Sequence, residues 1–225
     1  MPVNRPGTLG RGAPRSSLQM LIRQPPCPMI MPRLPAAALF VAFLRLLAPT
    51  GIDGQSLDVL SLDGRHIDPF HVAPSTRATV FVFTRTDCPI SNRFAPTIEQ
   101  LRREFERRGV RFWLVFVDPA EPADAIRAHL SEYGQQTLGL RDPRHTLVDF
   151  SGATITPEAA VYVSGDGPAR LAYRGRIDDR YVDFGRARSQ PLRHDLREAL
   201  EAVLAGRAVV PQTTAAVGCI IADLR

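Results

Sequence analysis

A single cysteine, Cys88, stands at the point of the sequence best suited to nucleophilic chemistry. It follows the run "TVFVF" (79–83), whose β-branched and aromatic residues predict a buried strand, and it precedes Pro89 and a helical pattern. Thiolate is the reactive form, and the N–H groups and dipole of a helix N-terminus favour it over thiol. The negative charge of the neighbouring Asp87 would instead disfavour the thiolate. A lone cysteine is often just a small buried apolar residue, but this position favours reactivity, and we predict that Cys88 is a nucleophile.

A second thiol is needed to complete such a reaction, because a sulfenic acid or mixed disulfide must be resolved. Three residues after Cys88, where a second cysteine often stands, the sequence has Ser91. Ser91 could donate a hydrogen bond to the thiolate or act as the helix N-cap. Cys27 lies in the N-terminal extension, which leaves Cys219 in "AVGCII", where Gly218 permits close backbone approach. An apolar strand whose cysteine merely packs is an equally good interpretation of that segment.

The elements around these residues alternate between strands and helices, which predicts an α/β sandwich with a largely parallel sheet and an antiparallel edge. The predicted strands cover 57–62, 79–83, 110–118 and 137–140, with a hairpin at 159–163 and 169–173 that turns at "SGDG". The predicted helices cover 94–109, 122–133, 145–150 and 192–205.

Two motifs resemble landmarks of the thioredoxin superfamily. In "TRTDCPISNRFAP", Cys88 and Ser91 take the places of the two active-site cysteines, and Pro96 takes that of the kink-forming proline. In "TITPEAAVYV", Thr156 and Pro157 resemble the cis-proline motif. The resemblance covers 56–205 and implies a thioredoxin-like sandwich with a central mixed sheet flanked by helices. It also implies a cis Thr156–Pro157 bond beside the cysteine, although a proline alone would be read as an ordinary loop residue.

Within that superfamily, the "DCP" wording and the inserted helix and strand look most like the redoxin branch, related to peroxiredoxins of the alkyl hydroperoxide reductase and thiol-specific antioxidant type. This resemblance implies a thiol oxidoreductase without a cofactor, in which Cys88 attacks a peroxide or a substrate disulfide. Cys219 would be the resolving thiol, Thr156 would contact the substrate, and an unidentified thiol would supply electrons. One position departs from the pattern: Arg85 stands where peroxiredoxins carry a threonine, which weakens the expectation of peroxidase activity.

An arginine-rich run, "YRGRIDDRYVDFGRAR" (173–188), follows the hairpin that carries the proline. Such a run is usually a solvated turn with weak ion pairs. It could also bring Arg174 or Arg176 near Cys88, where a guanidinium would stabilise thiolate and polarise a peroxide.

Two other functions compete with thiol catalysis. Copper chaperones of the same fold bind metal through two cysteines and a histidine. Only Cys88 of that pair is present and His145 is a weak third ligand, so we expect no metal site. The other alternative is a non-catalytic module whose cis-proline groove holds a partner segment.

Charge and hydropathy divide the chain into parts. The net charge of +5 comes from six arginines and no acidic residue in 1–50; the remainder carries 22 arginines and 23 acidic residues, and we expect no nucleic-acid partner. The apolar run "LPAAALFVAFL" (34–44) predicts a signal-peptide core or membrane anchor. We therefore expect an N-terminal extension (1–54), a thioredoxin-like redoxin domain (55–206) and a C-terminal segment (207–225), in a protein that is exported, periplasmic or tethered to the membrane.

Overall fold

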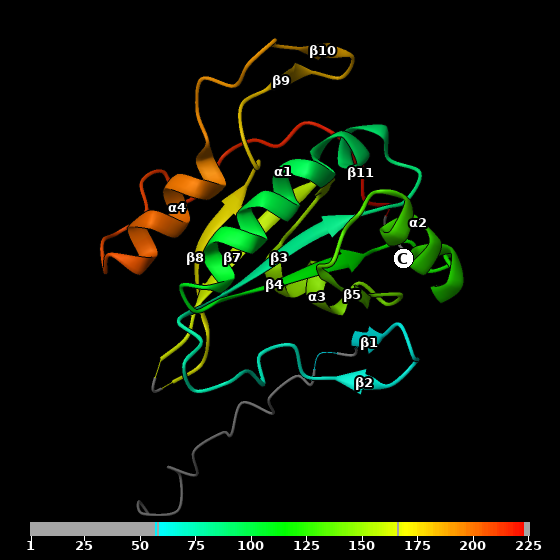
Figure 1. The fold of residues 1–225 in the computed structure, drawn as a ribbon, viewed down its shortest axis with the longest axis horizontal. Helices are drawn as coiled ribbons and strands as arrows, with labels where there is room; N and C mark the ends of the chain where they lie inside the picture. Colours follow the sequence, from blue (N-terminus) through cyan, green and yellow to red (C-terminus); the bar gives the residue numbers. More distant parts are fainter. Residues whose placement is uncertain (1–56, 58, 166, 223–225) are drawn as a thin grey trace, which may run out of the picture. The chain divides into compact units, whose positions relative to one another are not determined.

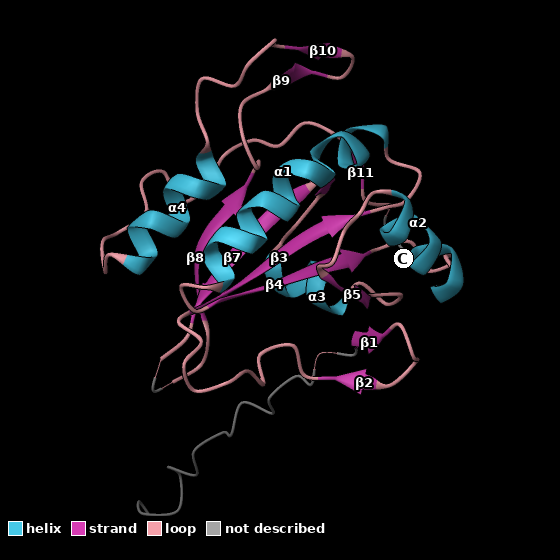
Figure 2. Ribbon diagram, in the orientation of Figure 1, coloured by secondary structure: helices cyan, strands magenta, loops and turns pink. Residues whose placement is uncertain are grey.

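The computed structural model describes residues 57, 59–165 and 167–222 (Figures 1 and 2). The predicted leader or membrane anchor within 1–54 lies outside these residues. In the part that is described, no helix is both long and apolar enough to cross a membrane.

A seven-stranded mixed sheet organises the described chain, in the order β2-β1-β5-β4-β3-β7-β8. Its strands are β1 (Val59–Ser61), β2 (His66–Ile67), β3 (Ala78–Thr84), β4 (Val110–Phe116), β5 (Leu138–Arg141), β7 (Glu158–Val163) and β8 (Arg170–Gly175). Strands β3, β4 and β5 are parallel, whereas β1, β7 and β8 pair antiparallel with their neighbours. Two smaller sheets pair β6 (Ile155–Thr156) with β11 (Cys219–Ile220), and β9 (Tyr181–Asp183) with β10 (Arg186–Ala187).

Helices cover both faces of the sheet because its central strands are apolar on both sides. All seven residues of β3 are buried. One face packs against α1 (Pro89–Glu106), α2 (Ala123–Glu132) and α4 (Asp195–Leu204), and the other packs against α3 (Thr146–Ser151). Figure 1 shows α1 and α4 crossing in front of the sheet, with α3 behind it. The predicted α/β class, a central mixed sheet flanked by helices, is confirmed.

Each predicted helix and strand overlaps an observed one, although boundaries differ; α1 begins at Pro89, five residues before the predicted start, and a second shift has a clear reason. The last helix begins at Asp195, three residues after the predicted start at Leu192. The backbone N–H groups of Leu192 and Arg193 donate instead to the carboxylate of Asp179, at 2.6 and 2.9 Å. These bonds hold the segment as a loop, and the Leu192 side chain is exposed.

The C-terminal segment beyond α4 is hydrogen bonded to the domain. It runs beside β8, where the Arg174 N–H donates to the Gln212 carbonyl (2.9 Å) and the Thr214 N–H donates to the Arg174 carbonyl (3.1 Å). The Thr214 hydroxyl is hydrogen bonded to Tyr173 Oη at 2.6 Å. The segment then turns across the end of the sheet and forms β11.

Candidate active site

Cys88 lies where β3 ends and α1 begins, and it is the N-cap of that helix. Its side chain is fully buried, and its carbonyl accepts the Asn92 N–H at 3.0 Å. Burial raises the pKa of the thiol, but the polar groups of Cys219, Ser91 and Thr156 outweigh burial, so the pKa of Cys88 is lowered. These contacts stabilise the thiolate form of Cys88.

The structure brings Cys219 directly to Cys88. The two sulfur atoms are 2.9 Å apart, although 131 positions separate the residues, and both cysteines are free thiols. Burial, followed by the hydrogen bond to Cys88 and the charge of Cys88, raises the pKa of Cys219 to about 12. The opposite directions make Cys88 the more acidic of the two thiols, so Cys88 loses its proton before Cys219 does.

Strand β6 supplies the backbone that holds the two cysteines together. In the antiparallel β6–β11 pair, Cys219 lies opposite Thr156, and the Ile221 N–H donates to the Thr154 carbonyl at 3.0 Å. The Thr156 carbonyl accepts the Cys88 S–H at 3.2 Å. The Thr156–Pro157 bond is cis. The backbone beside this proline, where the family resemblance implies that a substrate segment pairs, thus pairs with the chain's own C-terminal strand.

Glu158 and Arg174 brace the loop that carries β6. The Glu158 carboxylate accepts the N–H groups of Thr154 (2.8 Å) and Ile155 (3.3 Å). Arg174 pairs with Glu158 at 3.6 Å and donates to the Gly152 carbonyl at 2.6 Å. In the sequence, the position of Glu158 directly after Pro157 was the feature that could have indicated its role in bracing this loop.

Gly218 allows β11 to approach β6. A Cβ atom at this position would lie 2.7 Å from the carbonyl carbon of Thr156, and closer still to its oxygen. Only glycine fits there without a backbone shift.

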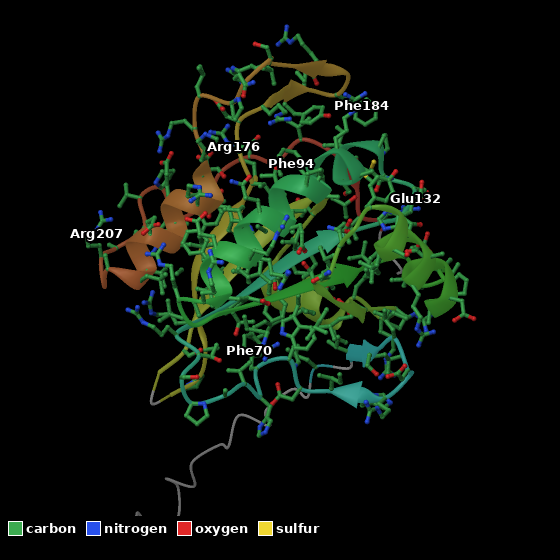
Figure 3. The ribbon with its side chains drawn as sticks, viewed as in Figure 1. Phe70, Phe94, Glu132, Arg176, Phe184 and Arg207 are labelled. Carbon is green, nitrogen blue, oxygen red and sulfur yellow. The ribbon has the colours of Figure 1, made fainter. Side chains whose placement is uncertain are left out.

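Ser91 and Arg176 are the remaining predicted site residues. Ser91 is the third residue of α1, so its prediction as N-cap is wrong: Cys88 takes that place. The buried Ser91 hydroxyl makes no hydrogen bond of ordinary geometry, yet it lies close enough to Cys88 to lower the pKa of that thiol. The Arg176 guanidinium pairs with Asp195 of α4 at 2.8 Å and is labelled there in Figure 3. None of the groups that shift the pKa of Cys88 is an arginine.

The sequence did not predict the charged cluster that Arg85, Asp87 and Asp118 form beside the cysteines. Arg85 forms two bonds of 3.0 Å with Asp87 and one of 3.0 Å with Asp118. Asp87 raises the pKa of Cys219 and Arg85 lowers it, so the effects of these two charges on that pKa partly cancel. Because Arg85 is held by two carboxylates, its charge is neutralised locally.

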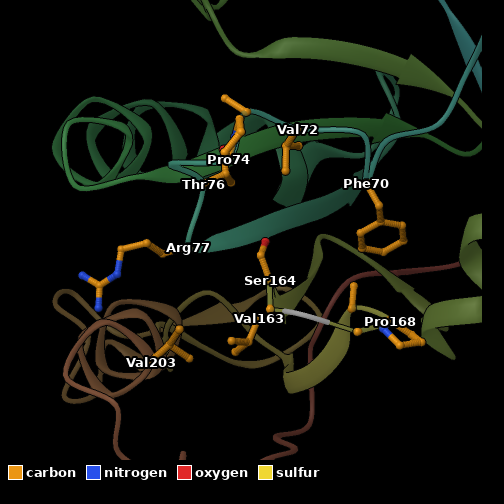
Figure 4. Close-up of a pocket in the computed structure, with 13 residues that line it drawn as sticks. Phe70, Val72, Pro74, Thr76, Arg77, Val163, Ser164, Pro168 and Val203 are labelled. Carbon is orange, nitrogen blue, oxygen red and sulfur yellow. The ribbon is translucent and has the colours of Figure 1, made fainter.

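His145, the candidate third metal ligand, is hydrogen bonded to the backbone. His145 bonds the Val117 carbonyl at 2.8 Å through Nε2. Across the described residues, no group of three His, Cys, Asp or Glu side chains could hold a metal ion. A pocket of about 750 Å³ opens between Phe70, Arg77 and Pro168 (Figure 4). It lies at the start of β3, one strand length or about 20 Å from Cys88.

No family model matches this sequence, and no curated protein matches it. Solved structures do match. An uncharacterized conserved protein from Geobacillus kaustophilus is 22% identical, over 74% of this chain and 88% of that chain, with a TM-score of 0.63. A hypothetical protein from Sinorhizobium meliloti is 22% identical, over 72% and 88%, with a TM-score of 0.58. A secreted disulfide oxidoreductase from Mycobacterium tuberculosis is 17% identical, over 68% and 98%, with a TM-score of 0.44. The first two likenesses show the fold alone, and membership of the thioredoxin superfamily and of its redoxin branch stays a prediction.

Proposed function

We propose that this protein is a thiol–disulfide oxidoreductase whose redox centre is the pair Cys88 and Cys219. The observation that carries the proposal is the separation of 2.9 Å between the two sulfur atoms in their reduced form. Such proximity gives the two thiols a high effective concentration for each other, so a disulfide between them closes without bringing distant groups together.

The pair completes a balanced reaction with an outside disulfide. In the overall exchange, the dithiol loses two electrons and two protons to a substrate disulfide, which becomes two thiols, and a Cys88–Cys219 bond forms. The Cys88 thiolate is the nucleophile that closes this bond, and Ser91 and Thr156 stabilise it before it attacks. Cys219 supplies the second sulfur. A thiol electron donor then returns the pair to the dithiol.

Disulfide exchange fits the site better than peroxide reduction. A peroxidatic cysteine gains from a guanidinium that polarises the peroxide. Arg174 is paired with Glu158 and Arg176 with Asp195, while Arg85 is bound by two carboxylates. An exported or membrane-tethered location is part of this proposal, because disulfide chemistry persists in oxidising compartments.

The test is oxidation of the reduced full-length protein in a Cys27→Ser background, which removes the third thiol. One equivalent of a small disulfide such as oxidised glutathione is added, and the products are mapped by non-reducing peptide mass spectrometry. We expect a Cys88–Cys219 disulfide and release of two glutathione molecules per protein. Parallel addition of hydrogen peroxide compares the two oxidants, and faster closure with peroxide would favour the peroxidase alternative.

The matched control is Cys219→Ser, which keeps a hydroxyl beside Cys88. This variant should form no internal disulfide. If the Cys27→Ser protein also forms none, the two cysteines do not act as a redox pair, and the non-catalytic binding module replaces this proposal.

A further inference from the structure

The two sulfurs of the pair differ in their access to solvent. Cys88 is fully buried, within the core cluster that also contains Val82 and Phe94. Cys219 is half-buried and lies on β11, whose next residue, Ile220, is 75% exposed. In thiol–disulfide exchange, the sulfur that is attacked must be reachable by the incoming sulfur.

Strand β11 is the element that covers Cys88. It is held on β6 by the Ile221 N–H, which donates to the Thr154 carbonyl at 3.0 Å, and by the Thr156 hydroxyl, which donates to the Cys219 carbonyl at 3.4 Å. Nearer the domain, the hydroxyl of Thr214 bonds the side chain of Tyr173. With β11 in place, an outside molecule meets Cys219 before it meets Cys88.

We infer that an outside donor thiol attacks Cys219, and that Cys88 serves as its buried partner inside the protein. This inference rests on the proposed function and specifies which sulfur of that redox pair meets the electron donor. The sequence predicted only that Cys88 meets the substrate and that Cys219 resolves the product, and it left the donor's point of attack open.

Reduction of the oxidised protein then follows a defined path. A donor thiolate attacks the sulfur of Cys219, a donor–Cys219 disulfide forms, and the bond to Cys88 breaks. Cys88 departs as a thiolate, and Ser91 and Thr156 lower the pKa of this group; a thiol of low pKa is a good leaving group. A second donor thiol attacks the donor sulfur of the mixed disulfide, so Cys219 is released and takes up a proton. Two donor thiols become one disulfide, and the protein gains two electrons.

The experiment determines which cysteine carries the donor. Full-length Cys27→Ser protein is oxidised with diamide, and peptide mass spectrometry first verifies the Cys88–Cys219 disulfide. Reduced glutathione is then added, the reaction is stopped with acid after short intervals, and free thiols are blocked with N-ethylmaleimide. We expect glutathione on Cys219 and maleimide on Cys88, with an excess of about tenfold or more over the opposite pattern because access limits attack.

The same oxidised protein in concentrated urea is the control, since unfolding exposes both sulfurs. There, glutathione should be found on both cysteines. Native protein that carries glutathione on Cys88, or equally on both residues, would overturn the inference while leaving the redox pair intact. If no disulfide forms in the first step, the proposed function fails, and the inference fails with it.

Discussion

Substitution of Gly218 by alanine tests whether the approach of β11 to β6 sets the reactivity of the sulfur pair. The added Cβ would lie 2.7 Å from the carbonyl carbon of Thr156, whereas ordinary contacts begin at 3.4 Å. Because the clash is with backbone, no side-chain rotation relieves it. Strand β11 must retreat by about 1 Å, and misplacement of reacting groups by about 1 Å can slow a reaction by about 100-fold.

We therefore expect Gly218→Ala to form the Cys88–Cys219 disulfide about 100-fold more slowly than the parent protein. The assay adds diamide to reduced Cys27→Ser protein, stops the reaction with acid and counts free thiols by maleimide mass shift. Gly165→Ala is the matched control, because a Cβ at residue 165 meets nothing within 4 Å. It should react at the parental rate. Closure of the Gly218→Ala pair within about twofold of the parental rate would refute the argument that β6–β11 contact positions the sulfurs.

Three further substitutions probe the thiolate, the C-terminal anchor and a buried carboxyl. Cys219→Ala should raise the pKa of Cys88 because it removes a hydrogen bond that lowers this pKa. Cys219→Ser keeps a donor and should shift the pKa of Cys88 less. Ultraviolet absorbance of the thiolate during a pH titration measures both pKa values. Thr214→Val removes the hydroxyl bonded to Tyr173 and should lower the free energy of unfolding, measured in urea, by about 1–2 kcal/mol. Thr214→Ser keeps the hydroxyl and should have a free energy of unfolding near the parental value. A parental free energy of unfolding in Thr214→Val would contradict this prediction. Burial raises the pKa of Glu121 above its ordinary 4.5, so the stability linked to its protonated form is lost as pH rises. Glu121→Gln should therefore raise the thermal midpoint of unfolding at neutral pH but not at about pH 4. An equal gain at both pH values would exclude titration of Glu121 as the cause.

The turn that carries Cys88 was predictable because its signals are local. An apolar β-branched run long enough for a central strand, followed by a proline at the first helical position and an amphipathic repeat, predicts strand, turn and helix in that order. The hairpin of β7 and β8 has the same kind of signal. The proline landmark also corresponds to a cis bond in the structure.

The contact between Cys88 and Cys219 was not predictable in the same way. Strand β11 has two residues, and its partner β6 lies 63 positions earlier, so neither strand has a pattern of its own. Long-range pairing of such short segments depends on the path of the chain after α4. Gly218 was a signal for close approach, but not for the surface that it approaches.

The roles of the arginines depended on acidic partners elsewhere in the fold. Arg174 and Arg176 follow the proline hairpin and were both candidates for the thiolate's neighbour. Glu158 binds the first and Asp195 the second. Such pairings depend on opposite charges that come together only after folding. The spacing of the arginines in the sequence therefore could not predict their partners.

The long separation of the two cysteines along the chain links their chemistry to folding itself. A bond between residues 131 positions apart would enclose every element from α1 to α4 in a covalent ring. In the chain-entropy account, a ring of this size removes about 5 kcal/mol of freedom from the unfolded ensemble. Reduction would therefore release both a pair of thiols and a topological restraint, so that the redox poise of the surroundings would also set how readily the domain unfolds.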